Sequence, residues 1–168
     1  EDLSTYPCNL NDDLKKIKLL NISILFIPKY SEMLSSKASI FVDDRRILNC
    51  IEGKRRPMFF SGVLTVVSKL FNITNPTDAF FGKKDPQQLF IIKKLCTDLN
   101  YNINIISCST IREKNGLAMS TRNNYLTSEE RKKASVIYES LLIAQIMIKN
   151  NIVSIKKIRL NMENIILS

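Results

Sequence analysis

The alternation of strand and helix patterns along residues 78–107 constrains the fold of this chain more than any other feature. Residues 78–81 have the pattern of a short strand, and Gly82 follows them. Residues 85–99 open with Asp-Pro, a cap and a first-position proline, and their apolar side chains recur at helical spacing. Residues 103–107 read as the next strand. The sequence therefore predicts an α/β fold with a mainly parallel sheet.

Further elements are expected upstream of this region. Residues 11–20 predict a helix with an acidic first turn, and residues 22–27 predict a buried strand that a proline stops. Residues 29–39 are expected to form a loop, and residues 40–42 another short strand. Ser61 is in position to cap a further helix, which an Asn-Pro pair ends.

The pattern changes in the last third of the chain. Residues 111–126 are expected to form an irregular loop, and the Thr-Ser-Glu-Glu capping box at 127–130 opens a long helix. A second helix is expected over residues 154–167. We therefore expect two domains, an α/β domain over residues 1–110 and the start of a mainly helical domain over residues 111–168.

The composition excludes several kinds of chemistry. The chain has 168 residues and no histidine, so it offers no histidine base, no serine–histidine pair and no histidine metal ligand. The four cysteines show no CxxC or zinc-site spacing, and we expect reduced, mostly buried thiols in a cytoplasmic protein. These are Cys8, Cys50, Cys96 and Cys108. Nothing in the sequence resembles a signal peptide, and the longest apolar run is too short to span a bilayer.

The net charge of +9 at pH 7 suggests anionic partners, such as a nucleotide, a carboxylate, a nucleic acid or a membrane. Because lysine is abundant along the whole chain, a solvated surface is the alternative explanation. The lysine clusters lack interleaved aromatic residues, which argues against a basic nucleic-acid-binding module. We therefore expect neither nucleic acid nor a membrane as a partner.

The turn that begins at Gly82 combines groups that suit a phosphate at the carboxyl edge of a parallel sheet. Glycine permits close approach of the backbone, and the start of the next helix offers free N–H groups. Lys84 is able to reach a phosphate oxygen, and Asp85 is able to cap the helix or hold a ribose hydroxyl. Gln88 suits a substrate that carries a hydroxyl and a carboxylate. Taken alone, the turn also fits an ordinary strand–helix connection.

Residues 119–122, Met-Ser-Thr-Arg, place two hydroxyl groups and a guanidinium on a loop to which Gly116 gives flexibility. Such a loop is able to close over a triphosphate and stabilise the charge of a leaving pyrophosphate. A polar linker between domains is the alternative interpretation.

Together these stretches resemble the pantoate–β-alanine ligase family, the pantothenate synthetases. The family carries Phe-Gly-Glu-Lys-Asp-aromatic-Gln-Gln-Leu and, some tens of residues later, Gly-Leu-Ala-Met-Ser-Ser-Arg-Asn-x-Tyr-Leu. Residues 81–89 and 116–126 match these two motifs in order and spacing. Residues 1–7, 52–57 and 62–70 resemble other family segments, so that the resemblance covers nearly the whole chain.

The resemblance implies a nucleotidylyltransferase-like, Rossmann-like fold with a smaller C-terminal domain, in a cytoplasmic homodimer that uses ATP as substrate together with Mg²⁺. In the implied reaction, the carboxylate of pantoate attacks the α-phosphorus of ATP, which gives pantoyl adenylate and pyrophosphate. The amine of β-alanine then takes the acyl group, which forms pantothenate and releases AMP. Positioning and charge neutralisation carry most of such chemistry.

The resemblance also assigns roles to residues of this chain. The implied ATP-binding positions are Gly82, Lys83, Lys84, Asp85, Ile111, Met119, Ser120, Thr121 and Arg122. The implied catalytic residues are Lys84, Ser120 and Arg122, and Ile111 matches a position whose backbone holds the adenine. Gln88 matches a pantoate contact, and Tyr6 and Arg56 match positions that line or support the pocket. Asp12 and Asp13 match an acidic pair that binds Mg²⁺ in some members, with helix capping as the alternative.

Four positions depart from the family pattern. Lys83 stands where the family has Glu and reverses a charge beside the phosphates, and Phe59 stands where the family has His. Pro86 replaces an aromatic residue, and Thr121 replaces Ser but keeps the hydroxyl. The changes at Phe59 and Lys83 leave a decayed, non-catalytic relative as an alternative to an active ligase.

The chain starts at Glu1 and ends at Ser168 inside an amphipathic pattern. We therefore expect it to be part of a longer protein, truncated at both ends. The N-terminal part that the resemblance implies would hold a His-containing motif for the triphosphate and a further pantoate-binding Gln. We expect the 168-residue stretch alone to be inactive.

Overall fold

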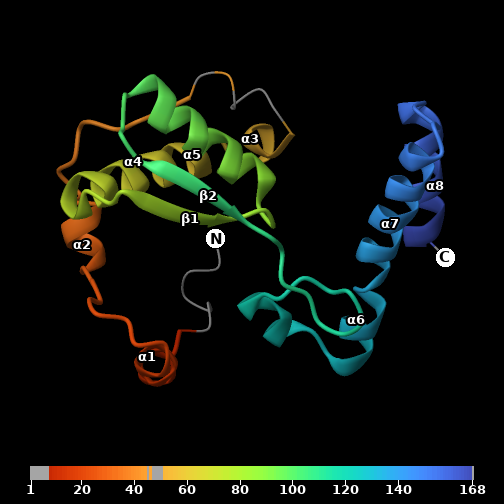
Figure 1. The fold of residues 1–168 in the computed structure, drawn as a ribbon, viewed down its shortest axis with the longest axis horizontal. Coiled ribbons are helices and arrows are strands. Elements are labelled where there is room, and N and C mark those ends of the chain that lie inside the picture. The colour runs from red at the N-terminus through yellow and green to blue at the C-terminus, as the bar shows by residue number, and fades with distance from the viewer. Residues whose placement is uncertain (1–7, 45, 47–50, 168) are drawn as a thin grey trace. The chain divides into compact units, whose positions relative to one another are not determined.

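The computed structural model describes residues 8–44, 46 and 51–167 (Figure 1). Its contacts divide it into two compact units. One unit is Asn21–Ser109, and the other joins the described parts of Glu1–Leu20 and Thr110–Ser168. The division expected between residues 110 and 111 stays a prediction, and each unit is described by itself below.

The unit Asn21–Ser109 contains a parallel sheet and its crossover helices. Its elements are α2 (Tyr30–Met33), α3 (Ile51–Arg55), α4 (Pro57–Thr74), β1 (Asp78–Gly82), α5 (Pro86–Asp98) and β2 (Asn104–Cys108). The strands β1 and β2 pair in parallel, with Ala79 opposite Ile105 and Gly82 opposite Cys108. Both predicted strands are thus confirmed within one residue, and so is the helix with Asp85 at its N-cap and Pro86 at its first position.

The topology places the starts of two helices at the carboxyl edge of the sheet. A helix that precedes or connects parallel strands runs back across the sheet, so α4 and α5 both begin where β1 and β2 end (Figure 1). Left-handed Asn75 ends α4, which confirms the predicted break at the Asn-Pro pair. Functional groups at these helix starts therefore share one edge.

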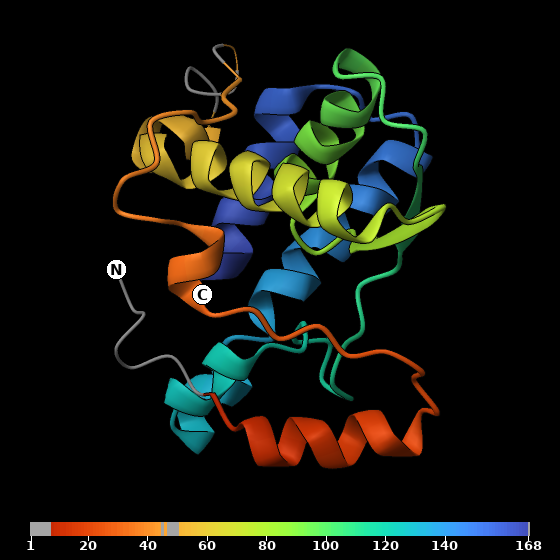
Figure 2. The same ribbon diagram turned by 90° about the vertical axis from the view of Figure 1, so that its left-hand side faces the viewer.

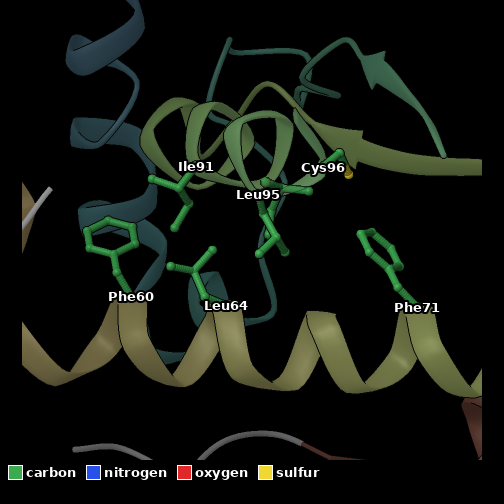
Figure 3. Close-up of a cluster of buried hydrophobic side chains, with 7 residues drawn as sticks. Phe60, Leu64, Phe71, Ile91, Leu95 and Cys96 are labelled. Carbon is green, nitrogen blue, oxygen red and sulfur yellow. The ribbon is translucent and has the colours of Figure 1, made fainter. Parts of the chain in front are cut away.

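The core of this unit lies between α4, α5 and one face of the sheet (Figure 3). Phe60 and Ile92 are fully buried, and Phe71 packs edge to face against Phe81 of β1 with ring centroids 6.4 Å apart. Ala79 and Phe81 point into this core, whereas Phe80 points the other way and is 68% exposed. The two-residue alternation of a strand produces this division.

The two strands predicted over residues 22–27 and 40–42 are wrong, because neither segment forms a strand and both are largely exposed. A strand needs a neighbour to take its backbone hydrogen bonds, and the described residues provide none for residues 22–27. Residues 40–42 are held by side chains instead, since the Val42 N–H donates to Thr65 Oγ1 over 3.0 Å. The expected loop over residues 29–39 contains the short helix α2.

Ser61 does not cap a helix, which is a second correction. The helix α4 begins one turn earlier, at Pro57, because proline fits the first helical position and Arg56 precedes it as the cap residue. Ser61 lies inside the helix, and its hydroxyl donates to the carbonyl of Val42 over 3.3 Å.

The second unit is mainly helical, with α1 (Leu10–Leu19), the 3₁₀ helix η2 (Thr121–Tyr125), α6 (Ser128–Lys133), α7 (Val136–Lys149) and α8 (Ile155–Leu167). The first predicted helix, seen side-on in Figure 2, is confirmed. Its N-cap is Asn9, whose side chain accepts from the Asp12 N–H. The capping box is confirmed, with Thr127 and Glu130 bonded to each other's backbone. The long helix predicted after it is divided at Ala134–Ser135 into α6 and α7, and α8 packs against α7.

None of the described helices combines the length with the hydrophobicity that a membrane span requires. Of the described cysteines, Cys96 is buried in the core and burial raises the pKa of its thiol. Cys8 and Cys108 are exposed, so the expectation of mostly buried thiols is wrong for both. Cys50 lies outside the described residues.

Candidate functional site

The predicted phosphate-binding turn lies directly at the carboxyl end of β1. The Lys83 N–H donates to the carbonyl of Cys108 over 2.8 Å, so backbone pairing continues one residue past Gly82. The chain then turns through Lys84 into α5. The strand pairing therefore fixes where the turn starts, and the first position of α5 fixes where it ends.

The side chains of this turn are exposed and uncommitted. Asp85 occupies the N-cap position of α5, but its carboxylate makes no cap hydrogen bond. Among the described residues, no ion pair or hydrogen bond is seen for the side chains of Lys84 and Asp85. A cation, a carboxylate and the N–H groups at a helix start are thus available together to a ligand.

Gly82 adds open space to this turn. A Cβ atom built on Gly82 would meet only the Lys84 nitrogen, at 3.9 Å, which is an ordinary contact. The chain's own packing therefore does not require glycine here, and the space above the residue remains for a ligand. Gln88 lies half-buried in the first turn of α5, and Arg56 lies at the start of α4, so both belong to the same sheet edge.

The second predicted cluster lies in the other unit, on a hairpin and the helix η2 that follows it. Arg112 and Ala118 form an antiparallel bridge, and the Met119 N–H donates to the carbonyl of Ile111 over 2.9 Å. Ile111 is 65% exposed and Met119 is 57% exposed, so this end of the hairpin presents apolar residues to its surroundings.

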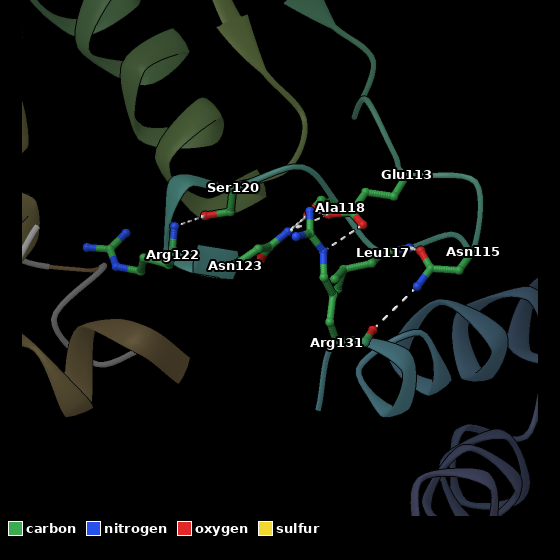
Figure 4. A network of polar contacts seen from close by, with 8 residues as sticks. All are labelled: Glu113, Asn115, Leu117, Ala118, Ser120, Arg122, Asn123 and Arg131. Carbon is green, nitrogen blue, oxygen red and sulfur yellow. Dashed lines mark hydrogen bonds and ion pairs between the residues drawn. The ribbon is translucent and has the colours of Figure 1, made fainter. Parts of the chain in front are cut away.

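Ser120 shapes the segment that carries the two hydroxyls and the guanidinium. As the cap of η2, its Oγ accepts from the Arg122 N–H over 3.2 Å, and its carbonyl accepts from the Asn123 N–H over 3.1 Å (Figure 4). Its hydroxyl proton is still able to donate, because accepting one bond uses only a lone pair. The side chains of Thr121 and Arg122 are exposed.

A polar network that the sequence interpretation missed supports this segment (Figure 4). The guanidinium of Arg131 donates twice to the carboxylate of Glu113, over 2.7 and 3.0 Å. The buried Asn123 side chain donates to Glu113 and to the carbonyl of Ala118, each over 3.0 Å. The hydrogen bond from Arg131 lowers the pKa of Glu113, and the bond from Asn123 lowers it further. The network therefore ties α6, the hairpin and η2 to a single carboxylate.

The hairpin turn is fitted to an aromatic ring of α7. Gly116 has φ +90°, and a Cβ there would overlap the Tyr138 ring. The guanidinium of Arg112 stacks on the same ring, 4.0 Å from its centroid, and donates to the carbonyl of Gly116 over 3.1 Å. Gly116 is thus required by steric fit, whereas the sequence interpretation gave it flexibility.

The remaining predicted residues are placed as follows. Tyr6 lies outside the described residues. The carboxylate of Asp12 accepts from the Asn9 side chain over 2.6 Å and from Lys15 Nζ over 3.1 Å, which is a helix-capping arrangement. No group of three or more His, Cys, Asp or Glu side chains suited to a metal ion occurs in the described part of the chain. Asp12 and Asp13 therefore do not form a resident metal site with described neighbours, and their role with Mg²⁺ stays a prediction.

The parallel sheet, its crossover helices and the turn after β1 define a protein of the nucleotidylyltransferase-like α/β class. The sequence then gives the particular family. The chain belongs to the pantoate–β-alanine ligase family, whose model matches residues 1–166.

Individual relatives agree with this assignment. The pantothenate synthetase of Clostridium acetobutylicum is 48% identical over 160 residues, which are 94% of this chain and 57% of that protein. The crystal structure of the Thermus thermophilus pantothenate synthetase superimposes with a TM-score of 0.92 at 34% identity, over 98% of this chain and 60% of that one. The Francisella tularensis pantoate–β-alanine ligase, complexed with beta-gamma ATP and β-alanine, matches with a TM-score of 0.79 and also 34% identity, over 98% of this chain and 61% of that one. The chain thus spans about three fifths of the length of these three proteins.

Proposed function

We propose that this chain is the larger part of an ATP-dependent ligase that condenses pantoate with β-alanine to form pantothenate. The family assignment supports the class of reaction, and the neighbour solved with beta-gamma ATP and β-alanine supports these two substrates. The observation that carries the proposal is the turn after β1, where Lys84, Asp85 and the start of α5 offer uncommitted groups to a nucleotide.

In the proposed first step, a carboxylate oxygen of pantoate attacks the α-phosphorus of ATP, and pyrophosphate leaves with the electrons of the broken P–O bond. In the second step, the amine of β-alanine attacks the acyl carbon of pantoyl adenylate, AMP leaves, and the amine gives up its proton. Both steps develop charge on phosphate oxygens, so the contribution of the protein is positioning and neutralisation.

Roles follow for the residues of the sheet edge. Lys84 neutralises phosphate charge, Gly82 lets the backbone approach, and Asp85 holds a ribose hydroxyl. Gln88 offers its amide to the hydroxyl and carboxylate of pantoate. The side chain of Lys83 is exposed and adds a positive charge to the same turn.

Roles also follow for the hairpin and η2. Ser120, Thr121 and Arg122 bind phosphate oxygens, with the guanidinium of Arg122 stabilising the leaving pyrophosphate. Met119 belongs to the same phosphate-binding segment, and the backbone of Ile111 holds the adenine. Mg²⁺ enters with ATP as part of the substrate. We further propose a homodimer working in the cytoplasm, by analogy with the family.

The test is pantoate-dependent exchange between ATP and labelled pyrophosphate. It needs a hybrid enzyme, in which the chain is joined to those portions of the Clostridium acetobutylicum relative that it does not match. We expect the hybrid to catalyse exchange only with pantoate and to form pantothenate when β-alanine is added. The unmodified Clostridium protein is the positive control, and a folded but silent hybrid would identify this chain as a decayed relative.

A further inference from the structure

Arg56 and Phe59 form a stacked pair at the start of α4. Arg56 is the cap residue of the helix, and the Phe59 N–H donates to its carbonyl over 3.0 Å. The guanidinium carbon of Arg56 lies 4.3 Å from the centroid of the Phe59 ring. At this distance the electron-rich ring face attracts the cation, which gives the guanidinium a preferred place.

The ring itself is fixed by the core. Phe59 is half-buried, and it packs edge to face against Phe60 with ring centroids 5.2 Å apart at 71°. Phe60 is 0% exposed and belongs to the buried cluster of α4 and α5. Packing against the core therefore fixes the orientation of the Phe59 ring face on which Arg56 stacks.

The stacked guanidinium keeps its donors. No hydrogen bond or ion pair of the Arg56 side chain is seen among the residues that the structure describes. Stacking uses the face of the guanidinium and leaves the N–H groups along its edge, which is the geometry that binds a carboxylate or a phosphate with two parallel bonds. The ring thus holds Arg56 in place, and its side chain has no hydrogen-bond acceptor in the described part of the chain. Its N–H groups are therefore available to bind an oxyanion.

The pair lies at the edge of the sheet where the ligand is proposed. The helices α4 and α5 both start where β1 and β2 end, so Arg56 shares this edge with Lys84 and Asp85 (Figure 1). We infer that Phe59 is a positioning residue, which holds Arg56 as an arm for a substrate oxyanion, either the carboxylate of pantoate or a phosphate of ATP. This inference rests on the proposed function.

The test uses the hybrid enzyme described above and the NMR signals of its Arg56 side chain. In the unchanged protein these protons are shifted upfield by the ring, and Phe59→Leu, which keeps apolar bulk, abolishes the shift. Phe59→Tyr keeps a ring face and retains the shift. Titration with pantoate and, separately, with inorganic pyrophosphate shows which oxyanion perturbs the Arg56 Nε–H. We expect Phe59→Leu to raise the dissociation constant of that probe about two- to fivefold, and Phe59→Tyr to restore it.

A second variant gives a readout that packing alone would not change. In Phe59→His the ring gains a proton at about pH 6.5 and then repels the guanidinium, so we expect the upfield shift of the Arg56 side-chain protons to be lost between about pH 8 and pH 6. In the unchanged protein, measured without a probe, we expect this shift to stay constant over the same interval, because the Phe59 ring takes up no proton. If Arg56 responds to neither probe, or if Phe59→Leu binds as well as Phe59→Tyr, the inference is wrong. A hybrid enzyme without exchange activity would instead contradict the proposed function, irrespective of the NMR result for the Phe59 ring.

Discussion

At the scale of single residues, the Glu113 carboxylate is the anchor of the hydroxyl-bearing segment. It accepts from Arg131 of α6 and from the buried Asn123 of η2, and these bonds favour its charged form. Its pKa is therefore lowered below the ordinary value of 4.5. The contribution of this carboxylate to stability is fully present above pH 4.5 and is lost as the pH falls through the lowered pKa.

The variant Arg131→Met is expected to raise the pKa of Glu113 toward its ordinary value, because the largest cause of the lowering is removed. NMR titration of the Glu113 carboxyl carbon measures this change directly. The matched control is Arg159→Met, which breaks a pair with Glu163 on α8 and leaves Glu113 alone. An unchanged midpoint for Glu113 in Arg131→Met would show that the ion pair is not formed in solution.

Lys84 is the second residue with a distinct prediction. If its ammonium neutralises phosphate charge in the transition state, Lys84→Met lowers kcat of the hybrid enzyme by about 10²-fold. Lys93→Met provides the control, because Lys93 is an exposed lysine of α5, the helix that follows the turn. Initial rates of pantothenate formation are measured for both variants. An equal loss of kcat in the two would contradict the proposed role of Lys84.

At the scale of elements, the hairpin turn at Gly116 depends on a steric fit. Gly116→Ala places a methyl group into the Tyr138 ring at a positive φ, and we expect it to destabilise the protein by more than about 1 kcal/mol. Gly62→Ala is the matched control, because a Cβ built there would have nothing within 4 Å and the residue sits inside α4. That control is expected to be stabilising by roughly 0.5–1 kcal/mol. Urea unfolding of both variants measures the two free energies, and the same sign for both would contradict the fit.

Some elements could be predicted from the sequence because their signals lie within a few neighbouring residues. The turn from β1 into α5 was predicted correctly because Asp85 and Pro86 carry their own start signal. The capping box of Thr127 was predicted for the same reason. Residues 22–27 misled the interpretation, since apolar, β-branched composition indicates a tendency to pair and says nothing about whether a partner is present.

The features of the candidate site likewise separate into those that a local sequence pattern predicts and those that depend on distant residues. Gly82, Lys84 and Asp85 were predicted together because they are neighbours in sequence and form one turn. The bond between Glu113 and Arg131 joins residues 18 positions apart, and no short pattern announces it. The stacking of Arg56 on Phe59 could have been predicted from the sequence, because the two residues are three positions apart and residues at this spacing on a helical turn are neighbours.

At the scale of the whole molecule, the share of the relatives' length that the chain covers leads to a prediction about activity. The chain spans 57% of the Clostridium relative, and 60% of the Thermus structure. We expect the 168-residue chain by itself to give no pantothenate, whereas the hybrid enzyme gives measurable product. A coupled assay for AMP release compares the two at equal concentration. Turnover by the chain alone would mean that these residues suffice for the reaction.

The exposed run at residues 22–27, Ile-Ser-Ile-Leu-Phe-Ile, has a consequence for handling the protein. Six uncharged, β-prone residues without proline or glycine are the composition from which cross-β stacks grow, and in this structure Ile24 is 85% exposed. Copies of the chain are therefore expected to aggregate above a threshold concentration. Leu25→Lys should raise that threshold concentration, because stacked copies of the segment would then place like charges next to one another. Light scattering on a dilution series measures the threshold for both proteins.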